Sequence, residues 1–317
     1  MSRAFIFPGQ GSQAVGMGRE LAAAFPAARL VFEEIDETLK QKLSKLMFEG
    51  PEAELTLTAN AQPALMAVSM AVVRVLETEA KLDIGTAVAF VAGHSLGEYS
   101  ALAAARTFSL ADAARLLRLR GDAMQKAVPV GDGAMAAVLG LDADAVQAMA
   151  AEATKAPDGT TEICQVANDN APGQVVVSGA KAAVARAVDI AKAKGKRAIP
   201  LPVSAPFHCA MMKPAADAMA EALSRTTMAP PRVPLVANVT AQAVSDPLTI
   251  KDLLVQQVTA LVRWRESCLY MKGRGVDTVV ELGAGKVLTG LAKRIDSELA
   301  GVSVNTPADI DAFMKTL

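Results

Sequence analysis

The chain has 317 residues, of which 52% are hydrophobic, 21% charged and 4% aromatic, and its formal net charge is −1. This length and apolar content are typical of a globular enzyme with a large core of aliphatic side chains. The balanced charge and the scarcity of aromatic residues exclude a protein that binds nucleic acid through bulk charge or base stacking.

The sequence predicts neither a membrane span nor a secretory leader. The longest uncharged stretch, residues 55–73, is interrupted by Asn60, Gln62 and Pro63, and we expect a loop followed by a buried helix there. Met1 is followed within two residues by a short predicted strand instead of an apolar leader segment. We therefore expect no interaction with a membrane.

The cysteines indicate a reducing compartment. Cys164, Cys209 and Cys268 are odd in number, far apart in the sequence and outside any Cys-x-x-Cys spacing. This usage is typical of reduced thiols, so we expect a cytoplasmic protein.

The first third of the chain alternates short apolar strands with helices. We expect a strand over residues 4–7, helices over 18–32, near 52–55 and over 64–79, and a strand over 88–92. This alternation predicts a mainly parallel sheet covered by helices on both faces. Such sheets bind ligands at the carboxyl edge of their strands.

Ser95 lies at the centre of Gly93-His94-Ser95-Leu96-Gly97, directly after the last of these strands and before a helix-like stretch over 98–103. A strand, a sharp glycine-flanked turn and a helix together expose one hydroxyl at the helix N-terminus. The alternative is a packed turn whose glycines only relieve crowding. We interpret Ser95 as a nucleophile.

In the middle of the chain the predicted strands and helices follow a different order. This order, βαββαβ, is that of a ferredoxin-like subdomain. The expected strands cover residues 134–140, 162–168, 174–178 and 197–203, the helices cover 143–155 and 181–194, and a turn contains Asn170, Pro172 and Gly173. The ends of such a unit lie close together, so it can be inserted into a larger domain. We assign residues 129–202 to this subdomain and residues 1–128 and 203–317 to the catalytic domain, with the substrate site in the cleft between them.

The last third returns to the larger domain. We expect a strand over 233–238, helices over 250–259 and 264–272, a strand over 278–282, and a Gly-Ala-Gly turn into a helix over 286–295.

A serine nucleophile needs a base to take its proton, and histidine is the usual one. The chain has two histidines. His94 neighbours Ser95, so its side chain points to another face. His208 follows Pro202 and Pro206, which fix an irregular segment of the kind that commonly holds catalytic groups. Taken alone, His208 fits an ordinary core or surface role, but it is the one histidine available to Ser95.

The loop after the first strand has three interpretations. Gly9, Gly11 and Ala14 fit the G-x-G-x-x-[GA] pattern of a dinucleotide-binding oxidoreductase, with Glu33 and Glu34 further along. Alternatively, Pro8 stiffens a loop that directs backbone N–H groups at a bound oxygen. A tight turn that needs glycine is the third possibility.

Taken together, the motifs closely resemble those of the malonyl-CoA:acyl carrier protein transacylases of fatty acid synthesis. The resemblance runs from Phe5 to about Leu291 and is carried by Phe-Pro-Gly-Gln-Gly-Ser-Gln at 7–13, Gln62-Pro63-Ala64, Gly93 to Tyr99, Arg120-Gly121, Phe207-His208 and Glu281 to Leu288. It implies an α/β-hydrolase-like large domain with a ferredoxin-like small domain, in agreement with the predicted order of elements.

The resemblance also implies the catalytic roles. Ser95 would be the acylated nucleophile and His208 its base. The backbone carbonyl of Gln257 would orient the histidine in place of a carboxylate. The backbone N–H groups of Gln10 and Leu96 would hold the oxyanion.

The substrate-binding candidates follow from the same resemblance. Arg120 is offset from Arg115 and Arg118, which are spaced as on one solvated helix face. The resemblance implies that the Arg120 guanidinium pairs with the free carboxylate of a malonyl group. Gln62 and His94 would lie beside the acyl pocket. Phe207 would crowd an α-methyl branch, which favours malonyl over methylmalonyl.

We therefore expect ping-pong transfer of malonyl from malonyl-CoA to the phosphopantetheine thiol of acyl carrier protein, for fatty acid or polyketide synthesis. We expect no cofactor and no metal. Carrier proteins are acidic, and the densest basic cluster comprises Lys192, Lys194, Lys196 and Arg197. This cluster is either a docking patch or a solvated helix end.

Two further functional alternatives stay open at this point. A serine thioesterase or esterase of related fold would release free malonate and gives Arg120 no role. A carrier-binding scaffold with an inactive site would require that Ser95 or His208 cannot act.

Overall fold

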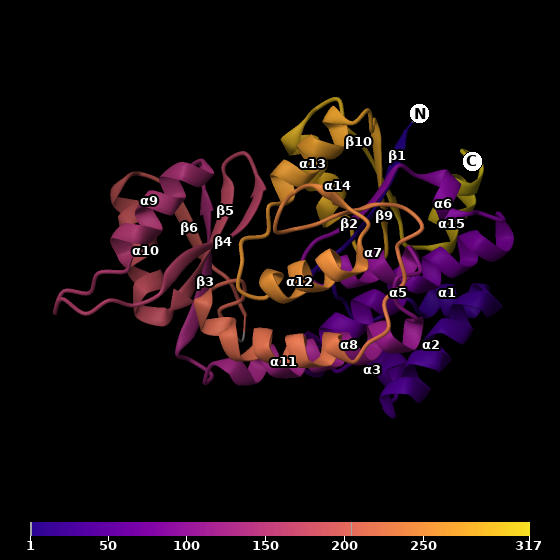
Figure 1. Ribbon diagram of the computed structural model, residues 1–317, viewed down its shortest axis with the longest axis horizontal. Coiled ribbons are helices and arrows are strands. Elements are labelled where there is room, and N and C mark those ends of the chain that lie inside the picture. The colour runs from indigo at the N-terminus through magenta and orange to yellow at the C-terminus, as the bar shows by residue number, and fades with distance from the viewer. Residues whose placement is uncertain (1, 204) are drawn as a thin grey trace.

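The structure, a computed structural model, describes residues 2–203 and 205–317. The chain forms two units, each built around its own sheet (Figure 1). The larger unit holds a six-stranded sheet and most of the helices, and the smaller unit holds a four-stranded sheet.

The six-stranded sheet has the strand order β10-β9-β1-β2-β7-β8. Neighbouring strands are parallel except β7 and β8, which confirms the expected mainly parallel sheet. The strands are β1 (Arg3–Phe7), β2 (Phe90–Gly93), β7 (Leu235–Val236), β8 (Ala243–Val244), β9 (Thr278–Leu282) and β10 (Ala300–Val304).

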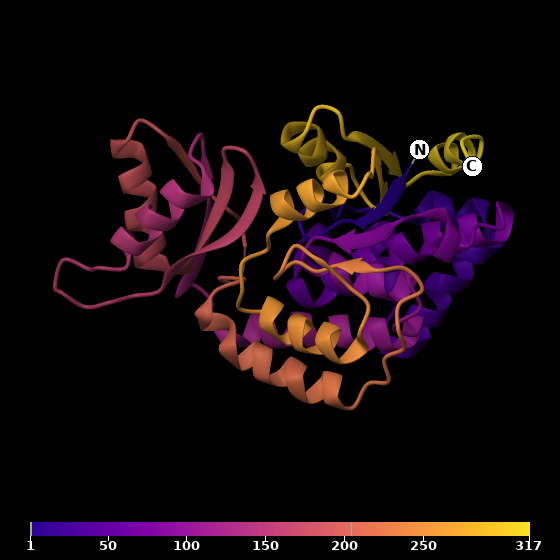
Figure 2. The ribbon, with the colours of Figure 1, turned by 45° about the horizontal axis from the view of Figure 1, so that its top comes forward.

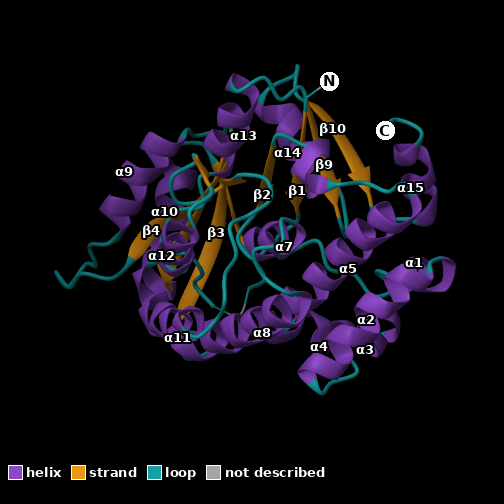
Figure 3. Ribbon diagram, turned by 45° about the vertical axis from the view of Figure 1, so that its right-hand side comes forward, coloured by secondary structure: helices purple, strands orange, loops and turns teal. Residues whose placement is uncertain are grey.

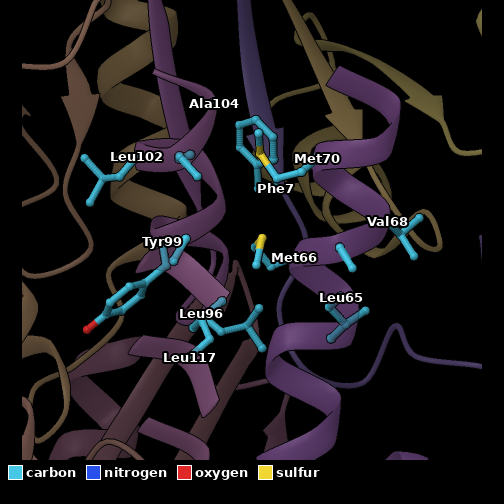
Figure 4. Close-up of a cluster of buried hydrophobic side chains, with 14 of the residues drawn as sticks. Phe7, Leu65, Met66, Val68, Met70, Leu96, Tyr99, Leu102, Ala104 and Leu117 are labelled. Atoms are coloured by element: carbon cyan, nitrogen blue, oxygen red, sulfur yellow. The ribbon is translucent and has the colours of Figure 1, made fainter. Parts of the chain in front are cut away.

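Strand β1 lies inside this sheet, and its side chains define the layers. Phe5 and Phe7 belong to the larger apolar cluster, whereas Ala4 and Ile6 belong to a second cluster. Successive side chains of a strand point to opposite faces, so the two clusters lie on the two sides of the sheet. Figure 4 shows Phe7 beside Met70 in the larger cluster. Both faces are therefore buried, as a parallel sheet requires.

Helices cover both of these faces. Figures 2 and 3 show α2, α5 and α8 packed together on one side, with α13 and α14 on the other. The helices of the larger unit are α1 (Arg19–Ala24), α2 (Pro26–Leu39), α3 (Leu43–Glu49), α4 (Glu52–Thr56), α5 (Thr58–Glu79), α6 (Ile84–Ala87), α7 (Gly97–Ala104), α8 (Leu110–Ala127), the 3₁₀ turn Ala210–Met212, α11 (Lys213–Ser224), α12 (Pro247–Gln257), α13 (Trp264–Gly273), α14 (Val287–Ile295) and α15 (Pro307–Met314).

Helix α5 is a core helix. It is long and apolar enough to cross a membrane by length and composition, but 94% of its apolar window is buried inside the protein. The loop expected over residues 55–63 is wrong, because α5 begins at Thr58 and includes Pro63. The proline removes one backbone hydrogen bond, and burial of the residues that follow outweighs that loss.

Two other expectations at the sequence level are corrected. The single helix over residues 18–32 is two helices, because Phe25 is extended and Pro26 starts a new helix. The strand expected over 233–238 is only the two-residue β7. Strand β10 was not predicted, since its first three residues are exposed and carry no apolar pattern.

The smaller unit has the βαββαβ order expected from the sequence, and its antiparallel sheet runs β4-β5-β3-β6. Its elements are β3 (Gly133–Leu139), α9 (Ala143–Ala153), β4 (Cys164–Ala171), β5 (Gln174–Ala180), α10 (Lys181–Ala193) and β6 (Arg197–Pro200). Asn170 lies inside β4, so the predicted turn narrows to Pro172 and Gly173. The first and last strands pair with each other, which brings the ends of the unit together. The domain limits at 129 and 202 stay a prediction.

The two units are joined by more than the connecting chain. Val262, which precedes α13, donates its backbone N–H to Ala167 of β4 at 2.9 Å and accepts from Asp169 at 3.0 Å. Asp169 also pairs with Arg265 at 2.8 Å. The sheet of the small unit is therefore fixed directly against the large one.

Candidate active site

The turn between β2 and α7 presents Ser95. A Cβ atom on Gly93 would lie 2.0 Å from the carbonyl carbon of Gly97, and one on Gly97 would lie 2.2 Å from the Phe7 oxygen. The turn can therefore close only with glycine at both positions. Ser95 itself has a φ of 53°, a strained left-handed conformation for a side-chain-bearing residue. Its amide donates to Asn238 Oδ1 at 2.8 Å, which supports this conformation.

Ser95, His208 and Gln257 form a continuous hydrogen-bonded chain. Ser95 Oγ lies 2.8 Å from His208 Nε2, and His208 Nδ1 lies 2.8 Å from the carbonyl oxygen of Gln257. A carbonyl oxygen only accepts, so Nδ1 carries the proton and Nε2 is free to accept from the serine hydroxyl. The structure thus brings together residues that are 113 positions apart in the sequence.

Arg120 projects from α8 to the same point and is only 1% exposed. Its Nη1 donates to Gln62 Oε1 at 2.9 Å, and its Nη2 donates to Gln257 Oε1 at 2.8 Å and to Ser95 Oγ at 3.1 Å. The guanidinium also lies 5.7 Å from the centre of the Tyr99 ring. These partners are all uncharged.

The Arg120 charge is incompletely paired. Among residues 2–203 and 205–317, no carboxylate forms an ion pair with Arg120, and its Nε atom has no hydrogen-bond partner. A buried cation in this state favours an anionic ligand, because the ligand would replace the hydration that the guanidinium has lost. Arg118, two residues earlier, contacts Gln41 and Asn60 instead.

Burial shifts the ionisation of His208 and Glu98. Burial, together with the positive charge of Arg120, lowers the pKa of His208 to about 3. It raises the pKa of the Glu98 carboxyl to about 7, although hydrogen bonds from Gln257 and Asn238 and the charge of Arg120 oppose the increase. At neutral pH the His208 imidazole is therefore uncharged.

These residues open on a cavity of about 470 Å³. Ser95, His208 and Arg120 line it from the large unit, and Met135 and Asn168 line it from β3 and β4. The cavity therefore lies between the two units, in the place where the sequence suggested a cleft.

The loop after β1 forms another part of the wall. A Cβ on Gly9 would lie 2.7 Å from the backbone oxygen of His94, so this loop packs directly against the serine turn. As a result, Gln10 and Leu96 both line the cavity beside Ser95.

The remaining sequence candidates have different surroundings. Gln62 and Phe207 line the cavity and are buried. His94 also lines it, but its Nε2 lies 2.8 Å from Asn170 Oδ1, so this ring connects the serine turn to β4. Lys192, Lys194, Lys196 and Arg197 lie outside the cavity, at the end of α10 and the start of β6.

Sequence reasoning missed three residues of the site. Asn238 holds the serine turn from both sides, since its Nδ2 also donates to the Gly93 oxygen at 2.7 Å. Glu98 is a buried carboxylate directly after the turn, and Asn170 binds His94. Asn238 is the last residue of the strand predicted over 233–238, and a polar residue at the carboxyl end of a strand is the signal that could have revealed it.

The dinucleotide interpretation fails on structural grounds. After Gly9 and Gly11 the chain makes turns, and the next helix begins only at Arg19. Glu33 and Glu34 lie on the exposed side of α2 instead of at a strand end. The part of the chain that the structure describes also contains no group of three or more His, Cys, Asp or Glu side chains placed to hold a metal ion.

The fold and site can now be compared with known proteins. A family model described as "Acyl transferase domain" matches residues 4–306. The malonyl CoA-acyl carrier protein transacylase of Bacillus subtilis is 46% identical over 315 residues, which is 99% of this chain and 96% of that protein.

Solved structures agree with this result. An acyl-carrier-protein S-malonyltransferase from Bartonella henselae is 56% identical, with a TM-score of 0.96 over 100% of this chain and 99% of that one. A malonyl-transacylase in complex with a type II polyketide synthase acyl-carrier protein is 42% identical, with a TM-score of 0.94 over the full length of both chains. The protein is an acyltransferase. It belongs to the malonyl CoA-acyl carrier protein transacylase family.

The ionisation of His208 can be measured directly. Because burial and Arg120 lower the pKa of His208 to about 3, we expect its imidazole to stay neutral from pH 8 down to about pH 5. Substitution Arg120→Met removes a positive charge, so the pKa of His208 should rise while burial still keeps it below 6.5. ¹⁵N NMR of histidine-labelled protein follows both rings.

Arg118→Met is the matched control, since its guanidinium contacts Gln41 and Asn60 and should leave the His208 signal unchanged. A His208 signal that titrates with a midpoint near 6.5 in the unaltered protein would contradict the interpretation.

Proposed function

We propose that this chain transfers a malonyl group from malonyl-CoA to the phosphopantetheine thiol of acyl carrier protein, through an ester on Ser95, in fatty acid or polyketide synthesis. One observation carries the proposal: a buried arginine without a carboxylate partner opens on the same cavity as a serine hydrogen-bonded to a neutral histidine. The names of the relatives, and the neighbour whose title describes a complex with an acyl-carrier protein, support it.

In the first half-reaction, Ser95 Oγ attacks the thioester carbonyl of malonyl-CoA while His208 Nε2 takes the hydroxyl proton. The resulting oxyanion would accept hydrogen bonds from the backbone N–H groups of Gln10 and Leu96. When the carbon–sulfur bond breaks, the proton on His208 passes to the leaving CoA thiolate. The products are the malonyl-Ser95 ester and free CoA.

In the second half-reaction, the thiol of the carrier protein takes the place of CoA. His208 removes the thiol proton, the thiolate attacks the ester carbonyl, and the proton returns to Ser95 Oγ as the ester breaks. The Gln257 carbonyl would hold His208 in the required tautomer throughout, because it binds the Nδ1 proton. Neither half-reaction calls for a cofactor or a metal ion.

Arg120 would orient the substrate. Its Nη2 donates to Ser95 Oγ at 3.1 Å, and a malonyl carboxylate is a stronger acceptor than a hydroxyl. Binding would therefore draw Arg120 toward the carboxylate and free the hydroxyl for reaction. Gln62 would steady the other side of the guanidinium, and Phe207 would limit the space for an α-methyl branch.

A thioesterase or esterase would use the same serine and histidine. Such an enzyme would pass the acyl group to water, and it would need no buried cation beside the nucleophile. Arg120 and the names of the relatives therefore favour transfer over hydrolysis.

The carrier protein would dock at the basic cluster formed by Lys192, Lys194, Lys196 and Arg197. Arg197 starts β6, and Leu201 just beyond this strand lines the cavity. Four residues of strand span about 13 Å, so the cluster is near enough to the cavity for a carrier to dock there while its prosthetic arm reaches Ser95. We also propose a cytoplasmic location, because the three cysteines are buried and unpaired.

Substitution Ser95→Ala should abolish the acyl-enzyme. Intact-mass spectrometry after brief exposure to malonyl-CoA is expected to show a malonyl adduct on the unaltered protein and none on the variant. Ser100→Ala is the control, because Ser100 Oγ is a buried hydroxyl of α7 that makes no hydrogen bond to a described residue. Retained acylation of Ser95→Ala would refute the proposed nucleophile.

Substitution Arg120→Ala should reduce kcat/KM for acylation by malonyl-CoA by about 100-fold, because a desolvated charge pair is lost. Acylation by acetyl-CoA, which lacks the carboxylate, should change by less than about fivefold. Arg118→Ala should alter neither rate. Equal losses for the two substrates would remove Arg120 from carboxylate recognition.

Reversal of the basic cluster should weaken carrier binding. The double variant Lys194→Glu/Arg197→Glu is expected to raise KM for acyl carrier protein about fivefold or more without changing Ser95 acylation by malonyl-CoA. The control for net charge is Lys81→Glu/Lys315→Glu. These lysines lie next to α6 and α15 in the sequence, and Figure 1 shows both helices at the end of the molecule opposite α10. An unchanged KM for the carrier would place the docking surface elsewhere.

A further inference from the structure

The side chain of Gln257 links two charged groups that do not touch each other. Its Oε1 accepts from Arg120 Nη2 at 2.8 Å, and its Nε2 donates to Glu98 Oε2 at 2.9 Å and to the Ser95 carbonyl at 3.0 Å. Both Gln257 and Glu98 are almost fully buried. A single amide therefore spans the gap between the arginine and the carboxyl group.

An amide group has a donor end and an acceptor end, and only one orientation suits Arg120. If the Gln257 amide were reversed, its NH₂ group would face the guanidinium, which offers only donors. Three acceptors of Gln257 Nε2 favour the observed orientation: Glu98 Oε2 is the nearest at 2.9 Å, followed by the Ser95 carbonyl oxygen at 3.0 Å and Asn238 Oδ1 at 3.4 Å. Glu98 Oε2 also accepts from the backbone N–H of Asn238 at 3.1 Å, which fixes the carboxyl group in turn.

We propose that Glu98 is a positioning residue that sets the preference for a carboxylate-bearing acyl group, because it orients the Gln257 amide and thereby holds Arg120 toward the cavity. The inference rests on the proposed function. It gives a role to a carboxyl group that is buried beside the serine turn and that neither half-reaction uses.

The arrangement around Arg120 explains why this support matters. The guanidinium is held by the oxygens of Gln257 and Gln62, which leaves Nε without a partner. Without the Gln257 oxygen, Nη2 would keep only the Ser95 hydroxyl as an acceptor. The guanidinium would then have several positions of similar energy, and a malonyl carboxylate would have to select one of them.

The ionisation of Glu98 makes glutamine a close mimic. Burial raises the pKa of this carboxyl to about 7, so protonated and ionised forms coexist at neutral pH. In both forms an oxygen can accept from Gln257 and Asn238. The amide oxygen of Glu98→Gln can do the same, whereas Glu98→Met keeps the length of the side chain and removes the acceptor.

The experiment compares two reactions of Ser95. Acylation by malonyl-CoA depends on Arg120, whereas labelling by an uncharged fluorophosphonate depends only on Ser95, His208 and the oxyanion site. For Glu98→Met we expect kcat/KM with malonyl-CoA to fall about 10- to 100-fold and labelling to change about threefold or less. Glu98→Gln should restore malonyl-CoA acylation to within about threefold of the unaltered protein.

Glu281→Met is the matched control. Glu281 is also a fully buried carboxyl, but it accepts from Leu288 and Thr289 backbone N–H groups and touches neither Gln257 nor Arg120. Its loss should affect both reactions equally. If Glu98→Met does not fold, as judged by urea unfolding, Glu98→Ala replaces it in the same comparison.

A double variant tests whether Glu98 acts through Arg120. In the Arg120→Ala background, Glu98→Met should cause no additional loss of malonyl-CoA acylation relative to labelling, because Arg120 is the group on which Glu98 acts. An additional loss, or equal losses of the two reactions in Glu98→Met alone, would overturn the inference. So would a Glu98→Gln variant that behaves like Glu98→Met.

The failure of the inference can be distinguished from failure of the proposed function. If the unaltered protein forms no malonyl ester at Ser95, the proposed function is wrong. If the ester forms normally and the ratio of the two reactions is insensitive to Glu98, only the role of Glu98 is wrong.

Discussion

The burial of the Arg120 charge is the constraint on which the site depends. Moving a guanidinium from water to the interior costs several kcal/mol, and Coulombic attraction to a carboxylate normally offsets that cost. Here neutral amide oxygens and the face of Tyr99 provide the immediate surroundings. The cation is therefore stable enough to remain buried and is still electrostatically unsatisfied, which is the state that an anionic substrate can exploit. The positive charge also lowers the basicity of His208, so the recognition and reaction centres are electrostatically coupled.

Much of the site could be predicted from sequence because its signals are local. The glycines around Ser95 indicate a turn in which no larger residue fits. His208 could be selected because the chain has only two histidines and His94 is adjacent to Ser95. Gln10 and Leu96 were named through the resemblance to the transacylase family, whose motifs at residues 7–13 and 93–99 are also local. By contrast, the contacts of Glu98 and the Gln257 side chain depend on how α7 and α12 meet in three dimensions. No spacing in the chain carries that information, because the two residues are 159 positions apart.

The elements of the fold also divide into those that local sequence predicts and those that tertiary contacts determine. Strand β9 was predicted with its observed limits, since residues 278–282 contain two valines and a leucine and end directly at the turn that begins with Gly283. The boundary between α1 and α2 was missed because Pro26 is compatible with a helix start as well as with a helix interruption. The start of α5 was missed for the opposite reason: Pro63 indicates a break, but packing in the core maintains the helix. In both cases tertiary contacts decided between local structures of similar energy.

The contact between His94 and Asn170 makes the small unit part of the scaffold that holds Ser95. Asn170 lies next to the end of β4, two residues before the Pro172–Gly173 hairpin, and His94 immediately precedes Ser95. An insertion in that hairpin, or its exchange for the hairpin of a relative, would shift the partner of His94 and so reach the Ser95 hydroxyl through a single peptide unit. A chimera that joins the two units from different parents would therefore have to inherit this asparagine in register.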